Sequence, residues 1–150
     1  MFIDGLTTAD SLPVLEAAAK FSARRQELLT FNIANISTPD FRPKTVSTEA
    51  FQQQLGEAID KKRKASGAAA QDLPLQSTSE VQVTPTAGGG FDLQLNPSTS
   101  SGNILFHDRN NRDVERMMAE LAENTANFRV ATELFRSRID MLRSVIAERV

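Results

Sequence analysis

The chain has 150 residues, of which 40% are hydrophobic, and a formal net charge of -2 at pH 7. These values indicate one soluble domain, and the charge is unlike that of a nucleic-acid-binding protein. Cysteine is absent, which excludes disulfides and thiolate metal sites, and the aromatic residues are nine Phe, which can only pack. No apolar run approaches the roughly twenty residues that span a bilayer, and the N-terminus lacks the pattern of a cleaved signal peptide. Composition thus indicates a cytoplasmic protein, unless export follows a route that leaves no cleavable signal.

A long first helix is predicted over about residues 11–36. Asp10 or Ser11 can cap its N-terminus, and Pro13 falls in the first turn, where a missing N–H costs little. Apolar residues at three-, four- and seven-residue steps form one stripe along it: Val14, Ala18, Phe21, Leu28, Leu29, Ile33 and Ile36. The opposite face carries charged residues, namely Glu16, Lys20, Arg24 and Glu27. Pro39 ends the helix, because a residue that precedes proline is disfavoured in the helical region.

Residues 42–109 are predicted to form a loop-rich insert. Residues 47–59 can make a short amphipathic helix with Phe51, Leu55 and Ile59 on one side. Residues 81–83 and 91–95 alternate apolar and polar side chains, so they can pair as a small β-hairpin, marginal by itself. The remainder is rich in Gly, Ser and Pro, and we expect it to be loop or disorder that is too polar to bury a core.

A second long helix is predicted over residues 110–150, which contain neither proline nor glycine. Apolar residues recur there at a strict interval of seven: Val114, Leu121, Phe128, Phe135 and Leu142. Others run beside them: Met117, Met118, Ala131, Ile139, Val145 and Ile146. A seven-residue stripe drifts around a straight helix, and a left-handed supercoil with a partner helix keeps it buried. At ~1.5 Å per residue the helix would be roughly 60 Å long, too long for a compact core.

The predicted fold class is mainly α. The two terminal helices are expected to pack as an antiparallel or staggered coiled-coil hairpin, so that residues 1–41 and 110–150 form one discontinuous helical domain interrupted by the insert. The C-terminal helix is longer by some fifteen residues, and part of its stripe therefore has no partner within the chain. Soluble monomers usually avoid such apolar patches, so we expect assembly with copies of itself or with related chains, in rings or open helical arrays.

Residues that could carry catalysis, a cofactor or a metal are not identified. His107 is the only histidine and is interpreted as a solvated turn residue, because no nucleophile accompanies it. Residues 88–90 are three glycines followed by a strand pattern, whereas a nucleotide loop is followed by a helix. The basic run at residues 61–64 is interpreted as a solubilising, flexible segment. Neither a nucleic acid nor a small-molecule substrate is expected.

Three asparagines are better candidates for specificity. Asn32 and Asn35 lie near or within the apolar face of the first helix, and Asn124 occupies a seam position of the last one. A polar residue in a coiled-coil seam typically fixes register at some cost in stability. For Asn35 the alternative is a C-terminal helix cap. For Asn124 we favour the register role.

Two segments resemble a known family. Residues 32–41, Asn-Ile-Ala-Asn-Ile-Ser-Thr-Pro-Asp-Phe, are similar to the N-terminal signature shared by bacterial flagellar rod, hook and hook-associated proteins. Residues 110–117, followed by Leu121-Ala122-Glu123-Asn124 and Phe128, are similar to the C-terminal helix of the proximal rod proteins of that family. The chain departs from the pattern at three positions: Asp40 and Arg109 replace glycines, and Phe128 replaces a tyrosine. Asp40 bears on the turn after Pro39, since glycine tolerates positive φ far better.

The resemblance implies a structural subunit of the flagellar rod in the periplasm, exported without a cleaved signal peptide and transmitting torque through packed helices. It implies contacts with other rod proteins, with further copies of the chain, with the adapter between rod and membrane ring, and with the flagellar type III export apparatus. The assembly residues expected are Phe21, Leu28, Asn32, Ile33, Asn35, Thr38, Pro39, Val114, Met117, Leu121, Asn124, Phe128, Phe135 and Leu142. The alternatives are another rod or hook component and, from a different class, a rod-associated wall hydrolase.

Overall fold

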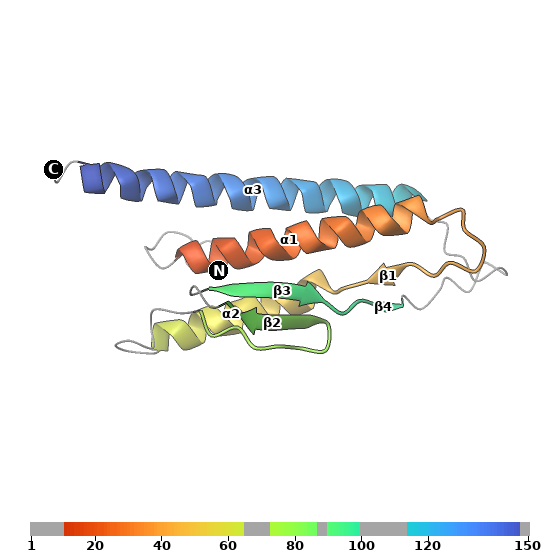
Figure 1. The fold of residues 1–150 in the computed structure, drawn as a ribbon, viewed down its shortest axis with the longest axis horizontal. Helices are drawn as coiled ribbons and strands as arrows, with labels where there is room; N and C mark the ends of the chain where they lie inside the picture. Colours follow the sequence, from red (N-terminus) through yellow and green to blue (C-terminus); the bar gives the residue numbers. More distant parts are fainter. Residues whose placement is uncertain (1–10, 65–72, 87–89, 100–113, 148–150) are drawn as a thin grey trace.

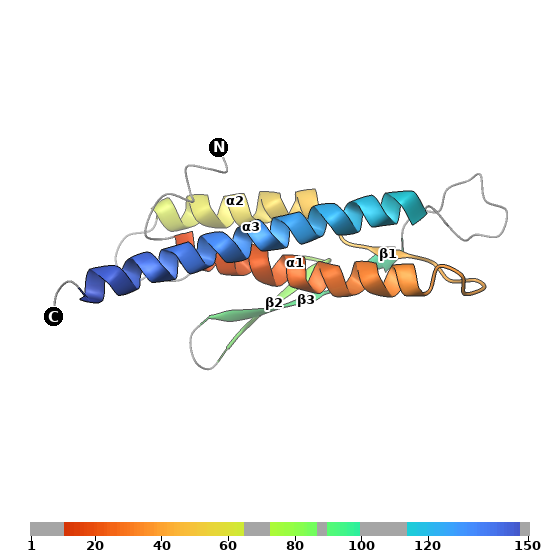
Figure 2. The same ribbon diagram turned by 90° about the horizontal axis from the view of Figure 1, so that it is seen from above.

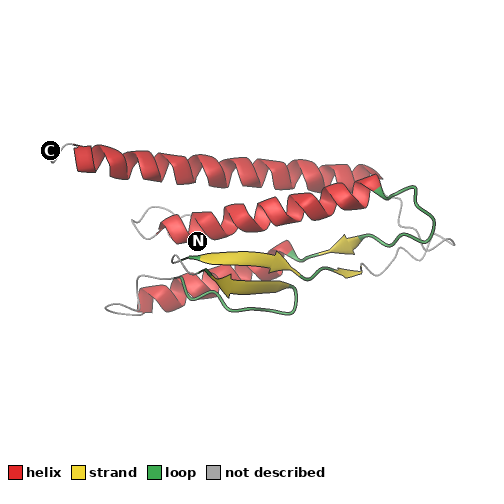
Figure 3. Ribbon diagram, viewed as in Figure 1, coloured by secondary structure: helices red, strands yellow, loops and turns green. Residues whose placement is uncertain are grey.

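The computed structural model describes residues 11–64, 73–86, 90–99 and 114–147. Most of them lie in three helices, α1 (Ser11–Ala34), α2 (Thr48–Lys64) and α3 (Val114–Ala147). Four strands form two antiparallel pairs (Figure 3): β2 (Val81–Pro85) with β3 (Phe91–Leu95), and β1 (Lys44–Thr45) with β4 (Ser98–Thr99). The prediction of a mainly helical chain with a short helix and a small β-hairpin in its middle is confirmed.

Helix α1 is the central element of the fold. Helix α3 lies along one side of it and runs antiparallel to it, while α2 and the β2–β3 hairpin lie on the other side (Figure 1). Seen from above, α2 and the hairpin flank α1 on opposite sides (Figure 2). The terminal helices are thus neighbours, and supercoiled packing between them stays a prediction.

The main hydrophobic core lies between α1 and the middle of the chain, and it includes Val46 and Leu73 from the part that was expected to be too polar to bury a core. Its buried members come from α1, α2, the hairpin and the segments that connect them: Val14, Ala17, Phe21, Val46, Phe51, Leu55, Ala58, Leu73, Val81, Phe91 and Leu93. At its centre the rings of Phe21 and Phe51 stack with centroids 3.9 Å apart. Only one face of each short element is apolar, and α1 gathers these faces into one cluster.

The charged face of α1 holds the hairpin in place. Lys20 donates to the Phe91 carbonyl, and its ammonium lies 4.7 Å from the centre of the Phe91 ring. The Arg24 Nε donates to the Leu93 carbonyl at 3.2 Å, and its guanidinium lies 3.6 Å from the Asp92 carboxylate. Two side chains of the face opposite the predicted stripe therefore bind the carbonyls of β3, an edge that would otherwise be open to pairing.

Helix α2 begins where the sequence indicates and ends later. The Ser47 Oγ accepts from the Ala50 N–H at 3.1 Å, as an N-cap side chain does, and the Glu80 carboxylate accepts from the Ser47 N–H at 2.8 Å. The helix continues past Ile59 to Lys64, so the basic run at residues 61–64 is its last turn and not a flexible segment. Positive charge at a helix C-terminus is favourable, because the unpaired carbonyls there carry partial negative charge.

Candidate assembly surface

The contact between α1 and α3 is centred on Asn124. This side chain is 2% exposed, and its Nδ2 donates to the Ser22 carbonyl at 2.9 Å and to the Gln26 Oε1 at 2.8 Å. The Gln26 Nε2 in turn donates to the Thr125 hydroxyl at 3.1 Å. Because a shift of one helix along the other would leave these buried groups unpaired, the cluster favours a single alignment of the two helices.

The α3 residues that α1 buries are not the predicted stripe. The buried ones are Met117, Asn124 and Ala131, a second column at seven-residue spacing. In the predicted column, Val114, Phe128 and Leu142 are exposed by 43%, 36% and 46%, and Leu121 and Phe135 are half-buried. A heptad seam needs both columns covered. Helix α1 covers one, and the other is left exposed at Val114, Phe128 and Leu142.

The C-terminal part of α3 extends beyond α1. Helix α3 has 34 residues against 24 in α1. Since Asn124 lies opposite Ser22 and Gln26, Ser11 at the start of α1 lies opposite about residue 137. We call residues 138–147 the α3 overhang; Figure 1 shows it projecting past the first turn of α1. It exposes four large apolar side chains, Met141, Leu142, Val145 and Ile146, by 46–67%.

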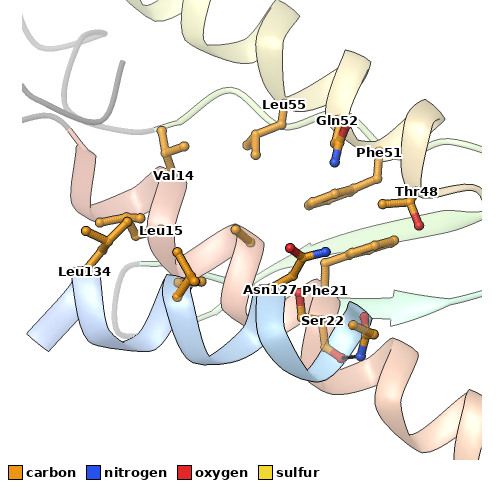
Figure 4. A pocket seen from close by; sticks show the side chains of 14 residues that line it. Val14, Leu15, Phe21, Ser22, Thr48, Phe51, Gln52, Leu55, Asn127 and Leu134 are labelled. Carbon is orange, nitrogen blue, oxygen red and sulfur yellow. Dashed lines mark hydrogen bonds between the residues drawn. The ribbon is translucent and has the colours of Figure 1, made fainter. Parts of the chain in front are cut away.

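Two grooves border the α1–α3 pair. The first, which we call the α2–α3 groove, has a volume of about 320 Å³ and is shown in Figure 4. Its lining is mostly apolar and includes Val14, Phe21, Phe51, Leu55 and Leu134, with Gln52 and Asn127 among the polar members. Among the described residues that line it, none is charged and none is a histidine.

The second groove, which we call the Phe31–Phe128 groove, lies on the other flank of the helix pair. It has a volume of about 580 Å³ and is lined by Ala23, Gln26, Glu27, Thr30, Phe31, Ala34 and Phe128. The Phe31 ring is 54% exposed, and its edge-to-face contact with Phe41 holds it at the end of α1. Phe31 is not among the predicted assembly residues, because it falls outside the apolar stripe by spacing alone.

The Asn-Ile-Ala-Asn signature forms the end of α1 and the turn that follows. Asn32 is 2% exposed, and it donates to the Lys44 carbonyl at 2.7 Å and accepts from the Lys44 N–H at 3.2 Å. It therefore ties β1 to α1, a contact within the chain. The Asn35 Nδ2 donates to the Phe31 carbonyl at 2.9 Å, as expected for the helix-cap alternative.

The turn after Pro39 contains a residue in the left-handed conformation, and this residue is Asp40, where the family pattern has glycine. Asp40 has φ 59°, a conformation that side-chain-bearing residues adopt at a cost, although Asp and Asn tolerate it best. The Thr38 N–H donates to the Asn35 carbonyl at 2.9 Å inside the same turn. Thr38 and Pro39 are exposed.

The remaining predicted residues divide between core and surface. Phe21 lies in the core against α2, and the half-buried Leu28 packs against the same cluster. Ile33 is half-buried and Met117 is buried. The structure thus brings Met117 and Asn124 together on the face of α3 towards α1, and does not bring them together with the signature turn. His107, Arg109, Asn110 and two of the three glycines at 88–90 lie outside the described residues.

The described residues form neither a metal-binding cluster nor a membrane-spanning helix. Within the described ranges, His, Asp and Glu side chains nowhere gather in threes as a metal site requires. Also within them, each helix is too short or too polar to cross a bilayer. What the described surface offers is exposed apolar area on a long helix pair, which is typical of proteins that assemble with other chains.

Comparison with known proteins shows which kind of assembling protein the chain resembles. The chain is 28% identical to the flagellar basal body rod protein FlgB of Bacillus subtilis (strain 168) over 137 residues, which cover 88% of this chain and 89% of the relative. It is 25% identical to FlgB of Escherichia coli (strain K12) over 146 residues, covering 90% and 96%. It is 27% identical to FlgB of Yersinia enterocolitica over 134 residues, covering 89% and 90%. No protein-family model matches. The chain is thus similar over most of its length to FlgB proteins, which are flagellar basal body rod proteins.

Proposed function

We propose that the chain is a structural subunit of the proximal rod of the bacterial flagellar basal body. Its terminal helices would pack against those of neighbouring subunits as coiled coils and transmit torque. The observation that carries the proposal is the open column on α3, where Val114, Phe128 and Leu142 are 36–46% exposed beside a helix pair that already buries the companion column. The alignment with FlgB proteins over most of the chain supports the same reading.

The physical argument starts from the seven-residue interval. The two columns on α3 each repeat every seven residues, and each residue of one column follows a residue of the other by three. Together they make the two sides of a coiled-coil seam. In the folded chain one side rests on α1, and the other needs a further helix. Fully burying one side chain of this size contributes about 1.5–3 kcal/mol, so several such contacts per interface favour a stable array.

The proposed partners and location rest on the similarity to FlgB proteins. We propose that the neighbours are further copies of the chain and other rod proteins, together with the adapter that joins the rod to the membrane ring. Delivery to the periplasm would use the flagellar type III export apparatus without cleavage of a signal peptide. Catalysis and cofactors play no part in this mechanism, which requires stiffness and close packing.

The predicted assembly residues act in two ways under this proposal. Val114, Phe128 and Leu142 would contact a neighbouring subunit directly. Asn124 would set the alignment of α1 and α3, and Asn32 and Asn35 would shape the end of α1 that a neighbour meets. The remaining ones support these helices from within the chain.

The test is a pair of glutamate substitutions on α3. Leu142→Glu places a charge on the overhang, beyond the reach of α1, so the fold of the subunit is retained while the interface is disrupted. Ala126→Glu places the same charge on the exposed opposite face and serves as the matched control. Each variant is produced in a strain that lacks its own proximal rod subunit.

The measurements are swimming motility and the amount of the chain in purified basal bodies. We expect Leu142→Glu to abolish both and Ala126→Glu to preserve both. Normal incorporation of Leu142→Glu would overturn the proposal, and so would absence of the unaltered chain from basal bodies. A zone of clearing on peptidoglycan by the purified chain would instead revive the wall hydrolase.

A further inference from the structure

We propose that residues 1–10 of the chain occupy the α2–α3 groove of the same molecule, with Phe2, Ile3 and Leu6 covering its apolar lining. The inference goes beyond the proposed function, because it concerns a contact within the free subunit. Three observations select this occupant: the place where the segment joins α1, the composition of the segments that could reach the groove, and a buried hydroxyl at its edge.

The groove leaves apolar side chains uncovered. Val130 and Leu134 line it from α3 and are exposed by 59% and 39%, whereas Phe21, Phe51 and Leu55 of the same lining are buried. Figure 4 shows this lining between α1, α2 and α3. Soluble proteins typically cover a surface of this kind with other apolar side chains.

Residues 1–10 are well placed to provide that cover. They lead directly into the first turns of α1, where Val14 and Leu15 line the groove. Three of them are large apolar residues, Phe2, Ile3 and Leu6, and the others are mostly small or polar. The segment can therefore bury apolar side chains in the groove and leave its two aspartates in solvent.

The other segments outside the described ranges fit less well. Alanine and a single valine are the only apolar residues of 65–72, 87–89 and 148–150. Residues 100–113 are more apolar, but they lead into the start of α3, ten residues before Asn124, the first α3 residue of the groove. Residues 1–10 alone combine large apolar side chains with a junction at the groove itself.

The segment is long enough for this contact. The α1 residues that line the groove extend from Val14 to Ser22, which at ~1.5 Å per residue is roughly 12 Å. Residues 1–6 in extended form span roughly 20 Å, and residues 7–10 remain for the reversal of direction before α1. A short tether gives the segment a millimolar effective concentration at the groove, which favours it over a second copy of the chain in dilute solution.

A buried hydroxyl at the edge of the groove supports the same occupant. Ser11 lies one turn before Val14 and Leu15, on the same face of α1. It is 0% exposed, and its Oγ has no hydrogen-bond partner among the described residues. Buried hydroxyls are nearly always paired, and the chain that adjoins Ser11 on its other side is residues 1–10. We therefore expect a polar group of this segment to pair with the Ser11 Oγ.

The consequence is that the free subunit covers one of its two grooves by itself. A neighbouring subunit can enter the α2–α3 groove only by displacing residues 1–10. Val114, Phe128 and Leu142 are not part of the groove lining, so a neighbour can reach their column while the segment stays in place.

Thiol labelling tests the contact, since the chain has no cysteine of its own. Asn127→Cys places a thiol in the groove, and Ala126→Cys places one on the next residue of α3, outside the groove lining; both positions are exposed. The rate of reaction with a maleimide is measured on the purified full chain in three backgrounds. These are the unaltered segment, Phe2→Asp together with Leu6→Asp, and Thr8→Asp as the matched control for added charge. Circular dichroism checks that each variant keeps its helical content.

We expect Phe2→Asp with Leu6→Asp to speed the labelling of Asn127→Cys about tenfold, the factor that about 1.4 kcal/mol of docking free energy produces. We expect Thr8→Asp to leave that rate unchanged, and Ala126→Cys to react at one rate in all three backgrounds. Equal rates for Asn127→Cys throughout would overturn the inference. Faster labelling of both thiols would also overturn it, because it would show a loosened fold and not an uncovered groove.

Protein concentration distinguishes the possible occupants. Protection of Asn127→Cys by its own segment does not change when the chain is diluted. Protection that disappears on dilution would show that a second copy covers the groove, and would contradict the inference. The result is separable from that of the proposed function, because the labelling uses the purified chain and requires no basal body.

Discussion

Asn32 and Asn35 of the signature offer the sharpest test of the structure. The sequence predicts assembly roles for both, whereas the structure gives them different contacts and different burial. Asn32 is buried and makes two hydrogen bonds to the Lys44 backbone. Asn35 is half-buried and makes one, to a Phe31 carbonyl that already accepts from the Asn35 N–H. Replacing each by alanine should therefore have unequal consequences for the stability of the folded chain.

The expected size follows from the contacts. A hydrogen bond within a protein contributes about 0.5–1.5 kcal/mol net, so Asn32→Ala should lower the free energy of unfolding by about 1–3 kcal/mol. Asn35→Ala should lower it by about 0.5 kcal/mol, because the Phe31 carbonyl keeps its backbone partner. Asn32→Asp should be more damaging still, since a carboxylate accepts from the Lys44 N–H but turns a second acceptor towards the Lys44 carbonyl.

The assay is urea unfolding of the full chain followed by far-ultraviolet circular dichroism. The midpoint and slope give the free energy of unfolding for each variant. We expect the order of stability to be Asn35→Ala, then Asn32→Ala, then Asn32→Asp, whose buried carboxylate would face the Lys44 carbonyl. Equal stability of the two alanine variants would refute the assignment of Asn32 to the contact between α1 and β1.

Four further predictions concern the core, the turn and α3. Phe51→Ala should lower the free energy of unfolding by about 3–5 kcal/mol in the same assay, and a loss below about 1 kcal/mol would show that α2 is not part of the core. Asp40→Val should cost about 1–2 kcal/mol while Asp40→Gly should not destabilise, because a β-branched side chain is strained at positive φ; equal effects would contradict the left-handed turn. Asn124→Ala should cost about 1–3 kcal/mol, and no loss would mean that its bonds to α1 are not formed in solution. Truncation after Phe128 should abolish rod formation yet leave the chain exportable, as measured by electron microscopy and by immunoblotting of the secreted fraction; normal motility would count against the role of the overhang.

Sequence periodicity located the helices well. The repeats of apolar residues predicted all three helices and both strands of the hairpin, with ends that differ by a few residues: α1 stops at Ala34 where Ile36 was expected, and α2 runs on to Lys64. These differences arise because the end of a helix depends on capping contacts, such as Asn35 with Phe31, which spacing does not reveal.

Periodicity could not show which column of α3 meets α1. Both columns have the same spacing and similar apolar content, and the choice depends on the partner surface. Asn124 determines which column faces α1, because its amide donates to two acceptors on α1. The column that contains Asn124 is therefore the buried one. The signal was present in the sequence as a polar residue among apolar neighbours, and the resemblance to rod proteins marked the same segment.

The middle of the chain was the least predictable part. Its apolar residues are few and widely spaced, and each short element buries only one to three of them. Their contribution appears only when α1 brings them together, with Lys20 and Arg24 binding the carbonyls of β3. Long-range contacts of this kind are not encoded in local spacing.

The central claim is that the open column of α3 is an interface between subunits. The most direct measurement is an image of the intact basal body, at a resolution that allows side chains to be traced, with this chain placed in it. The account predicts helices of neighbouring subunits against Val114, Phe128 and Leu142, with the overhang buried. A rod in which this column faces solvent in every copy, or which lacks the chain, would contradict it.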